Sequence, residues 1–145
     1  GAGKIDRVKE GYRMCYVIVL TAGAVLCVMY QLAGGAFVSL FLDSGSSGAY
    51  SVGLSYVKFL SFFYSFIGLK ASTDGLLRGA GDVTAFTVAN LVNLAIRVSV
   101  TNLFAPVYGI QVAWMAVPLG WAANYVISFG WYLTGKWKKV RVIKK

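Results

Sequence analysis

The residues with the clearest capacity for chemistry are two amides and a guanidinium at helical spacing. Asn90, Asn93 and Arg97 are separated by three and then four residues, so a helix through them carries all three on one face. A charged side chain near the centre of a membrane span is costly, and such residues usually face the bundle interior or a water-filled pathway. The spacing therefore predicts that this face lines a cavity or an interhelical polar network. The alternative is that Arg97 only bonds backbone carbonyls or snorkels.

A second charge, Lys58, also lies inside an apolar stretch. Two interpretations stay open: its stem snorkels outward along the helix, or its ammonium group faces an aqueous cavity. Tyr64 and Trp114 are candidates for the lining of such a cavity, although aromatic stripes more often serve lipid contact and helix packing.

Several chemistries are disfavoured by the residues present. The chain has no histidine, no Cys cluster for a metal and no pair of carboxylates inside an apolar stretch for acid and base work. GAGK at the start is followed by Ile5, so it departs from the phosphate-binding Walker pattern. Cys15 and Cys27 are expected to be buried, reduced thiols. We therefore expect no enzyme activity, no cofactor and no metal.

The elements that must position these residues are membrane helices. Of the 145 residues, 58% are hydrophobic and 13% are charged, and the mean hydropathy is +0.68. The apolar residues form continuous blocks of about 20 residues or more, the length that a helix needs to cross the bilayer. The sequence predicts an all-α membrane protein with four transmembrane helices, and the expected spans are 14–42, 51–70, 84–104 and 110–134.

The net charge of +9 is distributed as in a membrane protein and not as in a nucleic-acid binder. Apart from Lys58 and Arg97, the basic residues occupy the first, third and last polar segments, including a tail at 135–145 that is expected to bind anionic headgroups. The positive-inside rule then places both ends of the chain in the cytoplasm. The expected partner is the lipid bilayer, with no nucleic acid.

Four features bear on flexibility and completeness. Gly34 and Gly35 in the first span and Pro118 in the last are the expected flex points. A polar turn is expected at 73–84, where Gly79 and Gly81 permit unusual backbone angles and Asp82 caps the next helix. All five acidic residues are expected in loops or at span ends, which leaves Arg97 and Lys58 without a carboxylate in the membrane. Their partner is then a substrate anion or a group on missing helices, and the start at Gly1 also hints at a longer protein.

The motifs resemble those of the multidrug and toxic compound extrusion (MATE) transporters over nearly the whole chain. The matching segments are GLLRGAGD at 75–82, NLAIRV at 93–98, GIQVAWMAVPLGW at 109–121 and FGWYLTGKWKK at 129–139. GLLRGAGD and AVPLGW, in this order and spacing, are fairly specific for the bacterial multidrug branch. The resemblance implies a twelve-helix bundle of two lobes, in which this chain supplies the last four helices.

The resemblance also implies a function. It suggests a secondary active antiporter in the cell membrane that exports drugs or other amphipathic organic compounds in exchange for Na⁺ or H⁺. Its partners would be a small organic substrate and the remaining helices of the transporter. Two alternatives stay open: a lipid-linked oligosaccharide flippase of the same superfamily, in which Arg97 and Lys58 would bind phosphate, and a non-transporting membrane subunit.

Overall fold

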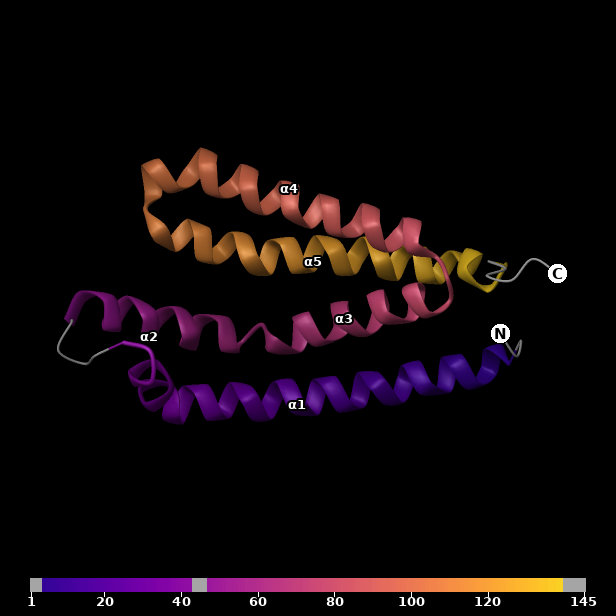
Figure 1. Cartoon of the computed structure of the whole chain (residues 1–145), viewed down its shortest axis with the longest axis horizontal. Helices are drawn as coiled ribbons and strands as arrows, with labels where there is room; N and C mark the ends of the chain where they lie inside the picture. Colours follow the sequence, from indigo (N-terminus) through magenta and orange to yellow (C-terminus); the bar gives the residue numbers. More distant parts are fainter. Residues whose placement is uncertain (1–3, 43–46, 140–145) are drawn as a thin grey trace.

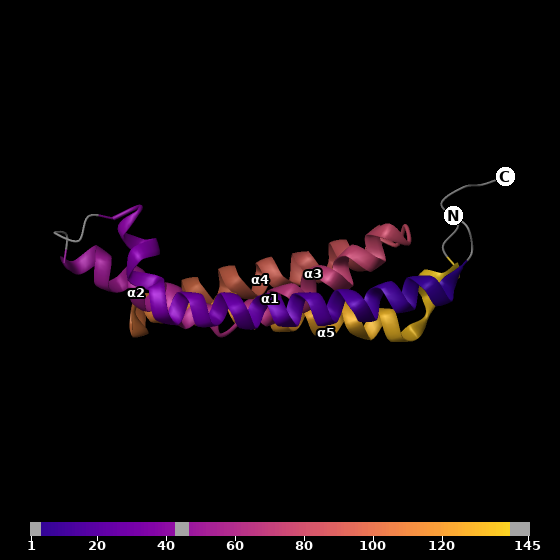
Figure 2. The same cartoon turned by 90° about the horizontal axis from the view of Figure 1, so that it is seen from below.

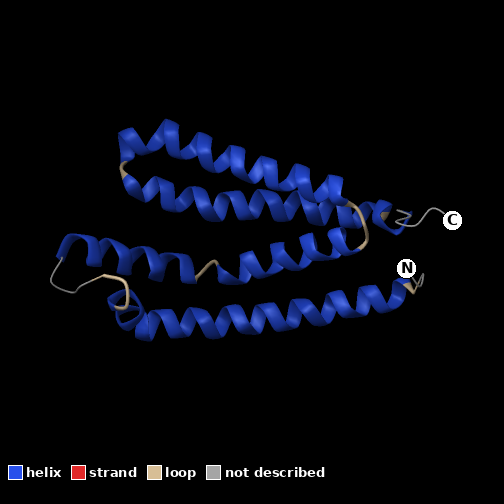
Figure 3. Ribbon diagram, in the orientation of Figure 1, coloured by secondary structure: helices blue, strands red, loops and turns tan. Residues whose placement is uncertain are grey.

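The computed structural model describes residues 4–42 and 47–139, and it contains helices and no strands in these ranges (Figure 3). Three of the helices are long and apolar enough to cross a membrane, or four spans when a bent pair is counted as one. The predicted all-α membrane fold is therefore confirmed. The elements are α1 (Ile5–Ser39), α2 (Ser47–Ser61), α3 (Tyr64–Gly79), α4 (Val83–Tyr108), α5 (Ile110–Thr134) and the short 3₁₀ helix η1 (Lys136–Lys139).

The long helices pack side by side in the order α1, α2–α3, α5, α4 (Figure 1). Seen from below, they overlap one another along most of their length (Figure 2). α3 and α4, and α4 and α5, are joined by short connections and run in opposite directions, whereas α2 and α3 continue in one direction as a bent span (Figure 1). The start of α1 and the end of α5 with η1 lie at the same end of the molecule, which we call the terminal end (Figure 1). The α4–α5 turn at Gly109 lies at the opposite, distal end.

The turn expected at 73–84 is much shorter in the structure. Residues 73–79 continue α3, and only residues 80–82 connect α3 to α4. Gly81 has a φ of 86°, and the N–H groups of Gly81 and Asp82 bond to the carbonyls of Arg78 and Leu77, which is the Schellman pattern of a helix end. Asp82 then accepts a hydrogen bond from the N–H of Ala85, so its predicted role as the cap of α4 is confirmed.

The second expected span, 51–70, is divided between two helices. α2 and α3 are bent by 56° at Phe62 and Phe63, where the sequence has neither proline nor glycine. Just before the bend, the Ser61 hydroxyl donates to the Lys58 carbonyl at 2.7 Å, and the Gln31 amide of α1 donates to the same carbonyl at 3.0 Å. Side chains that bond to helix carbonyls compete with the backbone ladder and are a known cause of bends.

Glycines set the distance between neighbouring helices. A Cβ atom on Gly23 would lie 2.8 Å from the backbone nitrogen of Ser65, and one on Gly68 would lie 2.8 Å from the Cβ of Val19. α1 and α3 can approach this closely only because both residues lack a side chain. α1 runs unbroken through Gly34 and Gly35, and these two glycines are packing positions for α2 in this structure.

Parts of three expected segments lie outside the described residues. They are the glycines of GAGK at residues 1–3, residues 43–46 of the polar turn after the first span, and residues 140–145 of the basic tail. Within the described residues, both cysteines are free and half-buried.

Candidate functional site

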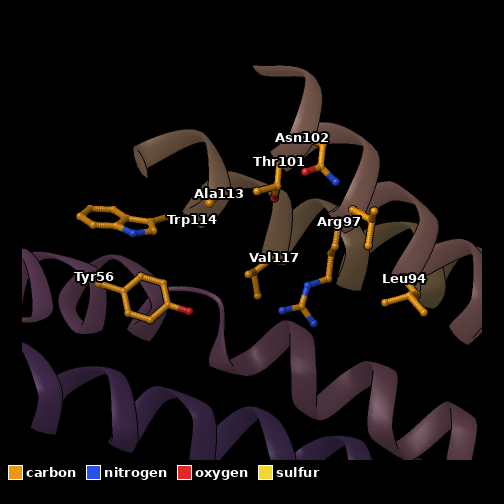
Figure 4. A pocket seen from close by; sticks show the side chains of 9 residues that line it. Tyr56, Leu94, Arg97, Thr101, Asn102, Ala113, Trp114 and Val117 are labelled. Atoms are coloured by element: carbon orange, nitrogen blue, oxygen red, sulfur yellow. The ribbon is translucent and has the colours of Figure 1, made fainter. Parts of the chain in front are cut away.

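An open pocket of about 490 Å³ lies beside α4 and α5, facing α2. Figure 4 shows the guanidinium of Arg97 extending from α4 into this pocket, with Tyr56 and Trp114 on the opposite side. We call it the Arg97 pocket. Its lining residues are Tyr56, Leu94, Arg97, Val98, Thr101, Asn102, Ala113, Trp114 and Val117.

Arg97 reaches this pocket because α5 presents a glycine opposite it. A Cβ atom on Gly120 would lie 2.9 Å from the Cγ of Arg97 and 3.2 Å from its Cδ, so the arginine stem passes directly over this glycine. The side chain is exposed and, among the described residues, forms no hydrogen bond or ion pair. Near the middle of α4, the chain thus presents a guanidinium whose charge no described residue neutralises.

The opposite wall of the pocket is aromatic. The rings of Tyr56 and Trp114 lie 5.5 Å apart between centroids at an angle of 49°, and the Tyr56 hydroxyl points toward Arg97 (Figure 4). Thr101 and Asn102 add neutral polar groups, and the lining contains no carboxylate. Such a wall can pack against an apolar or aromatic ligand, while the few polar groups fix its orientation.

Two buried amides lie along the α4–α5 interface. The side-chain oxygen of Asn93 occupies the space next to Gly120 that a larger residue would fill. Asn124 on α5 is 0% exposed. Asn93 Oδ1 and both polar atoms of the Asn124 side chain have no hydrogen-bond partner among the described residues. Buried amides without partners are unusual in native proteins, so this interface has unused hydrogen-bonding capacity.

A second polar group, which we call the Asp74 cluster, lies nearer the terminal end. Asp74 is buried; its Oδ2 lies 3.1 Å from the Lys70 ammonium, and its Oδ1 accepts a hydrogen bond of 2.6 Å from Ser128 on α5. Asn90 on α4 accepts from Lys70 at 3.0 Å and donates to Asp74 at 3.4 Å. The cluster therefore ties α3, α4 and α5 together with its charges paired.

Hydroxyl groups extend this connection to α1. Thr73 Oγ1 lies 2.7 Å from the Tyr12 hydroxyl and 3.0 Å from that of Tyr16, which in turn lies 3.2 Å from the Tyr125 hydroxyl. The Tyr12 and Tyr16 hydroxyls also bond to each other. Polar contacts thus join α1, α3, α4 and α5 near the terminal end. The Arg97 pocket, in contrast, is open.

The structure separates the three residues predicted to share one polar face. Asn90 belongs to the Asp74 cluster, Asn93 is buried against α5, and Arg97 enters the pocket. They lie at different levels of α4, where different neighbouring helices pack. The three residues all lie in α4 at helical spacing, but each one contacts different neighbours.

The remaining candidates fall at several places. The aliphatic stem of Lys58 packs over Gly34 of α1, where a Cβ atom on the glycine would lie 3.8 Å from the Lys58 Cγ and Cε. Lys58 does not line the Arg97 pocket. Tyr64 packs against Tyr30 of α1, with 5.4 Å between the ring centroids. Pro118 lies within α5, which continues through it, and lines a second, apolar pocket of about 170 Å³ together with Phe63 at the α2–α3 bend.

Sequence reasoning missed several of these residues, and Asp74 is the clearest case. The expectation that every acidic residue lies in a loop or at a span end is wrong for Asp74, which is buried inside α3. The spacing of Lys70 and Asp74, four residues apart, was a signal of a helical ion pair. Gln31 and Ser128 carried no comparable signal, because isolated polar residues in apolar stretches do not reveal their partners.

Comparison with known proteins agrees with the resemblance in the motifs. The model of the MatE family matches residues 1–120. A curated relative from Bacillus subtilis (strain 168), described as probable multidrug resistance protein YpnP, is 28% identical over 116 residues, which cover 79% of this chain and 26% of the relative. The chain thus spans about a quarter of the length of that relative. No solved structure matches this chain.

Proposed function

This chain belongs to the MatE family, and from that premise we propose that it is the C-terminal part of a secondary active antiporter. The complete transporter would export drugs or other amphipathic organic compounds in exchange for Na⁺ or H⁺. The description of the curated relative as a probable multidrug resistance protein supports this class of substrate.

The observation that carries the proposal is the contrast between two levels of the helix bundle. Near the middle of α4 the bundle has an open pocket with an aromatic wall and a guanidinium that no described residue pairs with. Near the terminal end, polar contacts join the helices instead. The neighbouring span is bent by 56°. Broken helices beside a site near the membrane midplane are typical of transporters that work by alternating access.

Two places where the regular helical hydrogen bonding is interrupted, the α2–α3 bend and Pro118 of α5, lie next to each other. Phe63 at the α2–α3 bend and Pro118 of α5 line the same apolar pocket. Proline removes a backbone donor from α5, which weakens the helix locally. We propose that these positions allow α2 and α5 to move relative to each other when access changes.

We place the coupling carboxylate outside this segment. Asp74 is paired with Lys70 and accepts a hydrogen bond from Ser128, so little of its capacity remains for Na⁺. Asp82 caps α4 and accepts a hydrogen bond of 2.7 Å from the Trp131 indole. Both carboxylates are therefore engaged in holding helices together.

The flippase alternative receives less support. Recognition of a lipid-linked phosphate or pyrophosphate would be expected to use several basic residues in one cavity, and Lys58 is not among the residues that line the pocket with Arg97. The pocket has one basic side chain within this segment, which suits a smaller organic ligand better.

Transport by the full-length protein tests the proposal. Proteoliposomes would be loaded in turn with a cationic, a neutral and an anionic amphipathic dye, and a Na⁺ gradient or a pH gradient would be imposed. We expect gradient-dependent movement of at least one dye, and the gradient that drives it identifies the coupling ion. Correctly folded protein that moves none of the dyes under either gradient would contradict the proposed function.

A further inference from the structure

The basic side chains of the described helices differ in how their charges are satisfied. Lys70 is paired with Asp74 at 3.1 Å, and the Arg78 guanidinium lies over the Phe86 ring, 4.7 Å from its centroid. Arg97 has neither an acidic nor an aromatic partner among the described residues, although it lies near the middle of a membrane helix. A charge at this depth requires compensation, which none of the described residues supplies.

The surroundings of Arg97 determine what could compensate it. Its guanidinium projects into a pocket whose other polar groups are neutral: the Tyr56 and Thr101 hydroxyls, the Asn102 amide and the Trp114 indole. These groups can donate hydrogen bonds, and none brings a negative charge. A cation in this pocket would be repelled by Arg97, whereas a carboxylate or phosphate could form paired hydrogen bonds with the guanidinium.

The size and composition of the pocket limit the ligand further. About 490 Å³ suits a molecule of drug size, and the Tyr56 and Trp114 rings form a wall against which an apolar or aromatic group can pack. The arginine and the aromatic wall face each other across the pocket (Figure 4). A ligand that contacts both must carry its negative charge at one end and its apolar part at the other.

We propose that the Arg97 pocket is a subsite for amphipathic organic anions, in which Arg97 binds the acidic group and Tyr56 and Trp114 pack against the apolar part. This inference rests on the proposed transport function and narrows it to a class of substrate. The anionic group has two possible sources, a soluble organic acid or the headgroup of an anionic lipid. Both would present the same chemistry to Arg97.

The test measures transport of three fluorescent probes by three variants of the full-length transporter in proteoliposomes. Pyrenebutyrate serves as the amphipathic anion and ethidium as the cation, and a fluorescent phosphatidylglycerol reports lipid movement. Arg97→Gln removes the charge, and Arg97→Lys keeps it. Arg78→Gln is the matched control, because Arg78 stacks on Phe86 outside the pocket. Thermal unfolding in detergent verifies that each variant is folded.

We expect Arg97→Gln to lower transport of the anion about tenfold or more, as when one partner of a charge pair is removed, and not to lower transport of ethidium, which Arg97 repels. Arg97→Lys should retain much of the anion transport, and Arg78→Gln should resemble the wild type. An effect confined to pyrenebutyrate indicates a soluble acid as the source, and an effect on phosphatidylglycerol indicates a lipid.

Equal loss of anion and cation transport in folded Arg97→Gln would overturn the inference, because Arg97 would then serve the structure or the transport cycle in general. Wild-type protein that moves ethidium but no anionic probe would also overturn it while leaving the proposed function intact. Wild-type protein that moves no probe would contradict both.

Discussion

At the scale of single residues, Lys70 and Arg97 show two ways of placing a cation in an apolar bundle. Lys70 is neutralised by a carboxylate four residues later on the same helix, and Asn90 shares that contact. Arg97 lies over Gly120, and its guanidinium extends into a pocket whose lining contains no carboxylate. The first arrangement ties α3 and α4 together, and the second leaves the guanidinium facing an open pocket.

This distinction predicts that Asp74→Asn is strongly destabilising. The substitution leaves the Lys70 ammonium largely buried without its carboxylate, and breaking a buried pair in this way costs about 3 kcal/mol. The measurement is the free energy of unfolding of the full-length protein in detergent. Asp6→Asn, at an exposed position of α1, is the control and should change stability by less than about 0.5 kcal/mol. Equal stability of the two variants would show that the pair contributes little.

At the scale of elements, polar contacts from α1 lie next to the bend between α2 and α3. The Gln31 amide donates to the Lys58 carbonyl at 3.0 Å and to the Ser61 hydroxyl at 2.9 Å, which ties α1 to the last turn of α2. Ser61 is buried, so these hydrogen bonds are not exposed to water. A single glutamine therefore links two helices next to the bend.

We expect Gln31→Leu to destabilise the protein by about 1–2 kcal/mol, because the buried Ser61 hydroxyl loses a hydrogen-bond partner. Gln111→Leu makes the same chemical change at an exposed position of α5 and should have little effect. Unfolding in detergent measures both variants. Equal stability of Gln31→Leu and Gln111→Leu would show that the hydrogen bonds of Gln31 contribute little to the stability of the protein.

The contact between α1 and α3 leads to a prediction about two glycines of the same helix. A Cβ atom on Gly68 would come within 2.8 Å of Val19 Cβ, whereas one on Gly75 would meet nothing within 4 Å. Gly68→Ala should therefore force the helices apart and destabilise the protein by about 1–3 kcal/mol. Gly75→Ala should be neutral or stabilise it by up to about 1 kcal/mol, because alanine favours the helix. A comparison of the two melting temperatures checks this, and the opposite order would argue against close packing at Gly68.

At the scale of the whole molecule, large apolar surfaces are exposed along the helices. Leu32 is 84% exposed and Phe41 is 87% exposed, and many other aliphatic side chains of α1 and α4 are exposed as well. Such surfaces suit lipid or further helices, and the chain spans 26% of its curated relative. These facts fit the expectation of a larger bundle with two lobes, which remains a prediction.

The distribution of basic residues predicts the orientation of this bundle. The terminal end carries the basic segments, so it should face the cytoplasm, and the α4–α5 turn should face outward. In full-length protein whose native cysteines are replaced by serine, a membrane-impermeant maleimide should label Tyr108→Cys in intact cells. Lys138→Cys should be labelled only after permeabilisation. The reverse pattern of labelling would place both ends of the segment outside.

The sequence by itself determined that the chain forms long membrane helices, because apolar runs of bilayer length have no other stable arrangement in lipid. It also identified Arg97 as an unusual charge and Asp82 as a helix cap, since both depend on the local sequence. The end of α3 was misjudged because Gly75 and Gly79 resemble turn residues, although the Lys70–Asp74 pair and the buried Leu77 favour a continued helix.

Only the tertiary structure decided which polar residues belong together. Asn90, Asn93 and Arg97 share a helix face, but they meet α3, α5 and an open pocket in turn, because a long helix passes different neighbours at different levels. Next to the bend at Phe62 and Phe63, α2 is hydrogen-bonded to Gln31, which lies about thirty residues earlier in the chain. Spacing along one helix defines a face, whereas the partners of that face are set by the packing of the other helices.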